Sequence, residues 1–266
     1  LRIGYFSSDF YEHATMYLMV HLLELHDRDA FEVHAFSYGP TPRDAMHRRV
    51  RAAVDGFHDV LGTGDKQMAL LARDLEIDIA IDLKGYTQNG RCGPFASRAA
   101  SVQISYLGYP GTLALPAMDY IVADHRVIPR EQAAHYTESI IYLPHSYQVN
   151  DSGREIAASC PARAEAGLPD TGFVFCCFNN SYKISPREFS IWMRLLDQVG
   201  GSCLWLLAGN PTVRDNLRRE ATQYGIDPDR LVFAEKMALA DHLARHALAD
   251  LFLDTFNYNA HTTASE

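Results

Sequence analysis

The stretch Asp250-Leu251-Phe252-Leu253-Asp254-Thr255, followed closely by His261-Thr262-Thr263-Ala264-Ser265-Glu266, decides the fold class. Its apolar run is typical of a buried strand in a parallel sheet, where helices cover both faces. Ligands of open α/β sheets bind at the carboxyl ends of the strands, so the hydroxyl-rich turn 261–266 is a candidate binding turn. A helix beginning at Thr262 or Thr263 would direct free N–H groups at an anion such as a diphosphate. An ordinary helix cap is an equally good interpretation.

The same pattern recurs along the whole chain. Apolar runs alternate with amphipathic stretches, which predicts an α/β fold with a mostly parallel sheet and helices on both faces. Strands are expected at 2–6, 31–38, 77–83, 102–106, 120–123, 173–178, 202–208, 231–234 and 251–254. Helices are expected at 15–25, 46–54, 67–75, 186–198, 213–224 and 240–247.

The alternation is interrupted once, where small and polar residues replace large apolar ones. This predicts an N-terminal Rossmann-like domain at 1–150, a linker at 151–169 and a second Rossmann-like domain at 170–266. Two such domains suggest a ligand cleft between them. The chain opens on a strand without an initiator Met and ends just after a binding turn, so we expect a piece of a longer protein with its C-terminal domain cut short.

Composition narrows the classes of function. The chain has 266 residues and a net charge of −9, which argues against nucleic acid or an anionic membrane as a partner. No apolar run approaches the roughly 20 residues that a membrane helix needs. The five cysteines form no CxxC pair, which favours a reducing, cytoplasmic location. Histidine and cysteine do not cluster at ligand spacing, so we predict no metal site.

Polar or glycine-containing turns follow five of the expected strands, at 7–13, 84–87, 107–112, 179–183 and 261–266. The chain lacks the GxGxxG, P-loop and GxSxG fingerprints of dinucleotide, nucleoside-triphosphate and serine-hydrolase sites. Within the first turn His13 follows Asp9 by four residues, and a carboxylate can orient an imidazole and raise its basicity. A surface pair that caps the next helix explains this spacing equally well.

Six motifs in this order resemble the catalytic region of the O-linked N-acetylglucosamine transferase (SPINDLY-like) family, in a bacterial form. They are Ser7-Ser8-Asp9-Phe10 with His13 and Thr15; Gly85-Tyr86-Thr87; Leu107-Gly108-Tyr109-Pro110-Gly111-Thr112 with Met118-Asp119-Tyr120; Phe178-Asn179-Asn180-Ser181-Tyr182-Lys183; Leu204-Trp205-Leu206-Leu207; and His261-Thr262-Thr263. The resemblance covers essentially the whole chain. It implies a GT-B fold, two Rossmann-like domains facing across a cleft, usually preceded by tetratricopeptide repeats. It also implies an inverting glycosyltransferase that needs no metal or other cofactor.

The resemblance also implies roles for individual residues. His13 is the candidate base or acceptor-side histidine, Asp9 the nearby carboxylate, and Lys183 the cation that binds the diphosphate of the leaving nucleotide. The walls of the donor-sugar pocket are Thr15, Tyr86, Leu107, Gly108, Tyr109 and Pro110. The nucleotide and its phosphates are assigned to Asn180, His242, Arg245, His261, Thr262, Thr263 and Glu266.

Some positions depart from the family's pattern. Glu266 stands where the family often has Asp, Leu239 where animal members have a nucleotide-contacting Lys, and Ala14 where Pro is usual. The implied reaction moves N-acetylglucosamine from UDP-GlcNAc to Ser or Thr hydroxyls of a protein or peptide acceptor. The alternatives are the same fold with UDP-glucose or GDP-fucose as donor, or a non-catalytic module that binds a sugar nucleotide or a protein.

Overall fold

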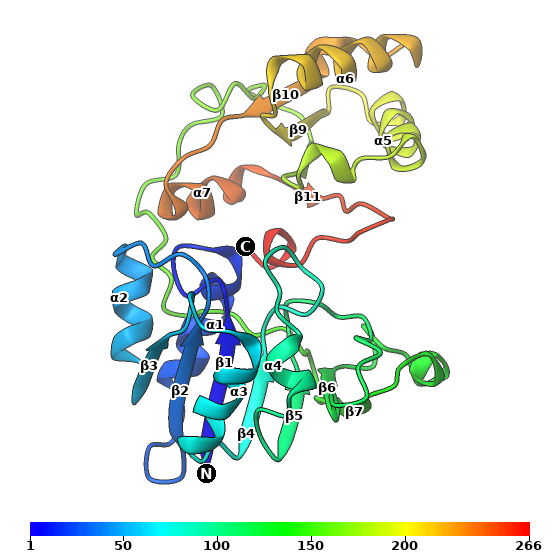
Figure 1. Cartoon of the computed structure of the whole chain (residues 1–266). Coiled ribbons are helices and arrows are strands. Elements are labelled where there is room, and N and C mark those ends of the chain that lie inside the picture. The colour runs from blue at the N-terminus through cyan, green and yellow to red at the C-terminus, as the bar shows by residue number, and fades with distance from the viewer. The chain divides into compact units, whose positions relative to one another are not determined.

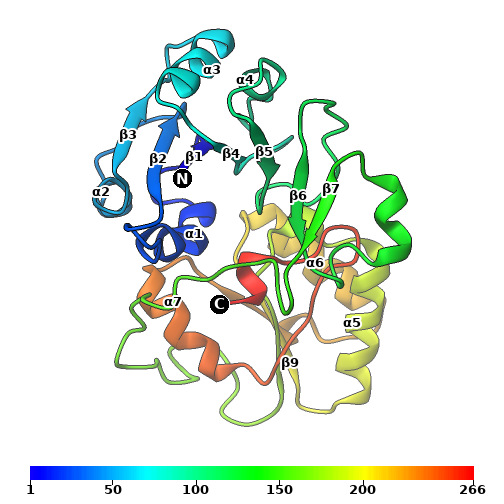
Figure 2. The same cartoon turned by 90° about the horizontal axis from the view of Figure 1, so that it is seen from below.

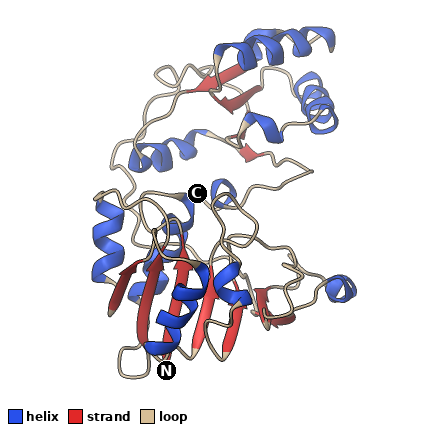
Figure 3. Ribbon diagram, viewed as in Figure 1, coloured by secondary structure: helices blue, strands red, loops and turns tan.

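The computed structural model describes residues 1–266 and divides the chain into two compact units (Figure 1). Unit 1 comprises Leu1–Gly153 and unit 2 comprises Arg154–Glu266. Each unit is a parallel sheet with helices packed on its faces, as the secondary-structure view shows (Figure 3). The α/β class expected from the sequence is confirmed.

Unit 1 contains a sheet of seven parallel strands in the order β3-β2-β1-β4-β5-β6-β7. The strands are β1 (Arg2–Ser7), β2 (Glu32–Ser37), β3 (Gly56–Asp59), β4 (Ile79–Asp82), β5 (Val102–Ser105), β6 (Tyr120–Ala123) and β7 (Ser139–Tyr142). The chain runs outward from β1 to β3, then returns to pair β4 with the other side of β1. This reversal creates a topological switch point between β1 and β4, the place where open α/β sheets bind ligands.

The helices of unit 1 cover both faces of its sheet (Figures 1 and 2). They are α1 (Ala14–Glu24), α2 (Ala45–Ala52), α3 (Asp65–Asp74) and α4 (Gly93–Ala96), with a 3-10 segment at Arg130–His135. Helices α1 and α2 pack in one apolar cluster and α3 and α4 in the other. Strand β1 serves both, because successive side chains alternate: Tyr5 lies in the first cluster, and Phe6 stacks on Phe36 in the second at 4.3 Å.

Unit 2 repeats this arrangement with four parallel strands in the order β10-β9-β8-β11. The strands are β8 (Val174–Cys177), β9 (Cys203–Leu207), β10 (Leu231–Ala234) and β11 (Leu251–Phe252). The helices are α5 (Pro186–Gln198), α6 (Pro211–Gln223) and α7 (Leu239–Arg245), and 3-10 turns lie at Ser181–Lys183, Pro228–Arg230, His246–Leu248 and Thr262–Ala264. The switch point of unit 2 lies between β8 and β11.

Strand β8 is buried on both faces, as its apolar sequence predicts. Phe175 and Cys177 pack towards α5, whereas Val174 and Cys176 lie in the opposite cluster. Leu168 joins that opposite cluster, so part of the segment expected as linker belongs to the core of unit 2. Segment 151–169 contains no helix or strand. All five cysteines are free thiols: Cys92, Cys160, Cys176, Cys177 and Cys203.

Helix α5 begins where its sequence dictates. Ser185 is the N-cap, Pro186 occupies the first turn, and the backbone N–H of Ser185 donates to Glu188 Oε1 at 2.8 Å in a capping box. This capping box fixes the backbone two residues after Lys183. The start of α5 therefore helps to position Lys183, a candidate binding residue.

The sequence missed three short elements: β3, α4 and β7. A 3-10 turn, Thr262–Ala264, begins at Thr262, one of the two positions suggested for a helix start. No helix of the chain is both long and apolar enough to cross a membrane.

Candidate functional site

Two of the candidate turns of unit 1 meet at its switch point through a buried ion pair. Lys84 Nζ, after β4, lies 2.5 Å from Asp9 Oδ2, after β1, and the two side chains are 6% and 3% exposed. The Asp9 carboxylate also accepts a hydrogen bond from Ser8 Oγ at 2.8 Å. Because a buried charge is costly unless paired, Lys84 and Asp9 hold each other in place.

A second buried carboxylate, Asp82, lies two residues before Lys84 in the chain. Asp82, the last residue of β4, accepts hydrogen bonds from the backbone N–H groups of Lys84 at 2.8 Å and Gly85 at 3.1 Å. Burial nevertheless raises the pKa of Asp82 to about 6. Asp82 thus shapes the turn that carries Lys84.

His13 is the N-cap of α1, and this contact defines its state. Its Nδ1 accepts a hydrogen bond from the backbone N–H of Thr15 at 3.2 Å and lies 3.4 Å from Asp9 Oδ2. Burial, aided by the positive charge of Lys84, lowers the pKa of His13 despite the opposing effect of Asp9. A neutral ring whose Nδ1 accepts must carry its proton on Nε2. His13 therefore caps α1 and presents Nε2 as a hydrogen-bond donor, but Asp9 is buried, so the two residues do not form the surface pair suggested by their spacing.

The third turn of unit 1 packs against the end of β4. A side chain at Gly108 would collide with the backbone carbonyl of Leu83, so only glycine permits this approach. The Tyr109 ring meets the Tyr86 ring edge-on at 5.6 Å, and Tyr86 Oη donates to the carbonyl of Leu113 at 2.6 Å. The residues expected to wall the sugar pocket lie after β1, β4 and β5 of one sheet: Thr15, Tyr86, Leu107, Gly108, Tyr109 and Pro110.

In unit 2 the buried side chain of Asn179 connects three segments. Asn179 Nδ2 donates to Thr255 Oγ1 at 2.9 Å, after β11, and Asn179 Oδ1 accepts from Thr263 Oγ1 at 2.7 Å. Sequence reasoning placed Asn179 inside a candidate turn but assigned binding to Asn180, which is exposed and bonds to Tyr182 Oη at 3.4 Å. The two asparagines differ in burial, Asn179 being buried and Asn180 exposed, and the sequence alone does not show this difference.

Lys183 differs from Lys84 in having no carboxylate partner. Its Nζ lies 3.4 Å from the carbonyl oxygen of Asn259 and 4.7 Å from the centre of the Tyr258 ring. The His261 ring stacks on Tyr258 at 5.5 Å, and burial together with the charge of Lys183 lowers the pKa of His261. A lysine, a histidine and the Thr262–Ala264 turn thus gather at the switch point of unit 2. Such a group can accept an anion.

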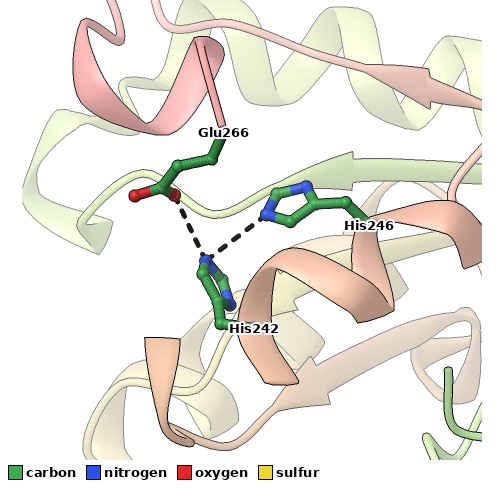
Figure 4. A group of neighbouring side chains, drawn as sticks. All are labelled: His242, His246 and Glu266. Carbon is green, nitrogen blue, oxygen red and sulfur yellow. Dashed lines mark hydrogen bonds and ion pairs between the residues drawn. The ribbon is translucent and has the colours of Figure 1, made fainter. Parts of the chain in front are cut away.

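Two of the remaining expected residues, His242 and Glu266, lie together with His246 at the end of α7 (Figure 4). His242 Nε2 lies 3.2 Å from Glu266 Oε2 and 3.4 Å from Nε2 of His246. Arg245 is buried, its guanidinium lies 4.8 Å from the Phe178 ring centre, and it donates to the carbonyl of Glu235 at 2.7 Å.

His246 was missed by the sequence reasoning, although it follows His242 by four residues. His242 lies in α7, and His246 begins the 3-10 turn directly after that helix. The premise that histidines never stand at ligand spacing was therefore wrong at this place. Burial and the neighbouring His242 lower the pKa of His246 to about 4.

The fold and the strand-end residues define the chain as an α/β protein of the GT-B class, built from two Rossmann-like units. The model of glycosyl transferase family 41 matches residues 1–157 and 151–266. The chain belongs to this family, which confirms the resemblance seen in its motifs.

Known relatives agree in sequence and in structure. The chain is 35% identical to the probable UDP-N-acetylglucosamine–peptide N-acetylglucosaminyltransferase SEC of Arabidopsis thaliana, covering 100% of this chain and 28% of that protein. It is 32% identical to the SPINDLY protein of Solanum lycopersicum, covering 100% of this chain and 29% of the relative. The chain thus spans less than a third of the length of either relative.

A solved structure of a mutant O-GlcNAc transferase from Thermobaculum terrenum matches with a TM-score of 0.90 at 32% identity, over 99% of this chain and 50% of that one. A glycosyltransferase from Rickettsia africae matches with a TM-score of 0.57 at 9% identity, over 94% of this chain and 72% of that one, and so shares the fold alone.

Proposed function

We propose that the full-length protein is an inverting glycosyltransferase that moves N-acetylglucosamine from UDP-GlcNAc to Ser or Thr hydroxyls of proteins. One observation carries the proposal: at the switch point of unit 2, Lys183 and His261 both lie against the Tyr258 ring, and Lys183 has no carboxylate to neutralise it. The relatives are named as probable UDP-N-acetylglucosamine–peptide N-acetylglucosaminyltransferases, which supports this choice of donor and acceptor.

Unit 2 supplies the nucleotide site in this proposal. When the sugar leaves, negative charge grows on the nucleotide diphosphate, and a fixed ammonium group stabilises the transition state more than the ground state. Lys183 fills this role without a metal ion. Asn179 acts as a positioning residue, because its amide holds the turn that carries Thr263.

Unit 1 supplies the groups that meet the sugar and the acceptor. The Leu107–Pro110 turn and Tyr86 form a rigid wall, since Gly108 is pressed against the backbone of β4. His13 presents Nε2–H as a donor, which positions a hydroxyl rather than accepting its proton. Asp9 is occupied by Lys84, so it supports the wall and His13 rather than acting as a free base.

The proposal also covers the parts of the full-length protein outside this region, its location and its partners. We expect tetratricopeptide repeats outside this region to present acceptor proteins, and we expect the protein to act in the cytoplasm. The net charge of −9 makes a nucleic acid or anionic membrane a poor partner.

A donor panel tests the proposal. The full-length protein is incubated with UDP-GlcNAc, UDP-glucose or GDP-fucose and a protein acceptor, and both nucleotide release and acceptor glycosylation are measured. We expect transfer from UDP-GlcNAc, unchanged turnover in EDTA, and an inverted anomeric linkage by NMR. Transfer from GDP-fucose alone would show that the donor is GDP-fucose and not UDP-GlcNAc. Donor binding without any turnover would make the protein a binding module.

A further inference from the structure

The geometry of His242, His246 and Glu266 points to a site for a divalent transition-metal ion such as Zn²⁺, which we propose excludes the nucleotide when it is filled. Each of the three residues offers one ligand atom, and these atoms all lie within 4.8 Å of one another (Figure 4). The metal site stands on this geometry alone. The exclusion of nucleotide rests on the proposed function.

Two of the ligand separations match a metal coordination shell. Ligand atoms bound to Zn²⁺ at about 2.0–2.1 Å are about 3.3 Å apart in a tetrahedron. The separations from His242 Nε2 are 3.2 Å to Glu266 Oε2 and 3.4 Å to His246 Nε2. All three ligand atoms lie within 4.8 Å of one another, so Glu266 and His246 would have to approach each other to share one ion.

Hydrogen bonding alone does not explain this cluster. His242 Nε2 faces a carboxylate oxygen and a second imidazole nitrogen at the same time. One ring N–H points at a single acceptor, and a ring nitrogen that donates to Glu266 has no lone pair left for His246. A cation at the centre satisfies all three ligand atoms at once.

A second histidine pair in the molecule shows the contrast. His34 uses Nδ1 for His58 Nε2 and Nε2 for Glu32 Oε1, each at 3.0 Å. Each nitrogen of His34 has one partner of its own, so neither is shared between two neighbours as His242 Nε2 is. This second pair provides a matched control for the experiment.

The donor set selects the class of metal. Two imidazoles and one carboxylate suit Zn²⁺, Co²⁺ or Ni²⁺, whereas Mg²⁺ and Ca²⁺ take oxygen ligands. His242 lies in α7, and His246 begins the 3-10 turn His246–Leu248 that directly follows it. This four-residue spacing is that of the histidine pair in zinc-binding helices. The intervening Arg245 is engaged elsewhere, with the carbonyl of Glu235 and the Phe178 ring.

A metal ion bound at this site would make two residues of the proposed nucleotide site unavailable to the nucleotide. His242 and Glu266 are the residues we assign to the nucleoside, and an ion between them occupies the lone pairs that would accept its hydrogen bonds. The metal therefore acts as an inhibitor of donor binding, and it is distinct from the metal-free transfer reaction.

Direct metal binding is measured first. Zn²⁺ is titrated calorimetrically into EDTA-treated full-length protein, and Co²⁺ is followed by its visible absorption, which is intense in tetrahedral sites. We expect one site, weakened at least about 100-fold in His246→Ala and His246→Gln, because loss of an outer partner alone costs about 10–100-fold. His58→Ala should bind as wild type. Equal Zn²⁺ binding by wild type and both His246 variants overturns the site.

Competition is measured second, with UDP as the probe. We expect Zn²⁺ to weaken UDP binding at least about tenfold in the wild type, EDTA to reverse this, and His246→Ala to bind UDP normally but no longer respond to Zn²⁺. The variant also reveals any effect of Zn²⁺ on UDP in solution. Zn²⁺ bound through His246 without an effect on UDP overturns the exclusion. Failure to bind UDP under any condition refutes the proposed function and leaves the metal site standing.

Discussion

The switch points of the two units have the same topology and opposite electrostatics. Each places a lysine just beyond a strand that borders the reversal in strand order, Lys84 after β4 and Lys183 after β8. Lys84 is buried and neutralised by Asp9, whereas Lys183 faces a carbonyl oxygen and an aromatic ring. The comparison teaches that topology selects where such a lysine stands, while its partner decides whether its charge is neutralised. This difference underlies the proposed roles, a fixed wall in unit 1 and an anion receptor in unit 2.

We expect the largest effect from a substitution that breaks the Lys84–Asp9 ion pair of unit 1. Lys84→Met leaves the Asp9 carboxylate buried and unpaired, so the free energy of unfolding of unit 1 should fall by about 3–5 kcal/mol. Hydrogen exchange of the β1 and β4 amides measures this loss. Combining the change with Asp9→Asn should recover most of it.

Tryptophan fluorescence provides an internal control for that variant. Trp192 and Trp205 both lie in the core of unit 2, so their unfolding transition should not change. A loss below about 1 kcal/mol in Lys84→Met would show that the pair is not essential to unit 1.

The second effect concerns pH. The folded-state pKa of Asp82, about 6, lies above its ordinary value of 3.8, so the folded state holds its proton more tightly than the unfolded state. Stability should therefore be greatest below about pH 4 for this group and be lost as pH rises through about 6, by up to about 3 kcal/mol. Asp82→Asn should remove this contribution, as chemical denaturation at pH 4.5 and 7 would reveal. An identical pH profile in the variant rules out this role.

The third effect tests the anion receptor of unit 2. Lys183→Ala should weaken UDP binding and slow turnover about 10–150-fold, because a charge-assisted contact contributes about 1.5–3 kcal/mol. Binding of neutral uridine should not change. Lys236→Ala, which alters an exposed lysine of the same unit, is the matched control. Full activity in Lys183→Ala would remove the observation on which the proposed function rests.

The smallest effect tests His13 as a helix cap. His13→Ala should lower the free energy of unfolding by about 0.5–2 kcal/mol, whereas His13→Asn, which keeps a cap acceptor, should lose only a few tenths. Thermal unfolding measures both. If His13 is instead a proton acceptor, kcat should fall about 10²–10⁴-fold in both variants alike.

Sequence reasoning predicted the long, strongly patterned elements and missed the short ones. Strand β6 and helix α5 have the expected bounds, because an apolar run and a Pro at the helix start are local signals. Strand β7 alternates between exposed and half-buried positions, and α4 is one turn long. Their formation depends on neighbours that the sequence does not place.

The candidate site shows the same division. Strand-end turns were identifiable because they interrupt apolar runs, and the structure brings the turns within each unit together. The ion pair of Lys84 with Asp9 was missed, since 75 residues separate the partners. The choice between Asn179 and Asn180 also required burial. His242 and His246, in contrast, carried a readable four-residue spacing that was overlooked.

The buried free cysteines of unit 2 can be used to detect local unfolding of its sheet. Cys176, Cys177 and Cys203 are buried in the sheet of unit 2, and burial raises their pKa values to about 12, 11 and 11. A thiol reagent can modify them only during excursions that expose strands β8 and β9. Cys160 is exposed, so its labelling rate gives the reference value for a fully accessible thiol. Mass spectrometry of a labelling time course would therefore measure how often the sheet of unit 2 opens locally. If unit 2 binds the nucleotide as proposed, bound UDP should slow the labelling of Cys176 and Cys177.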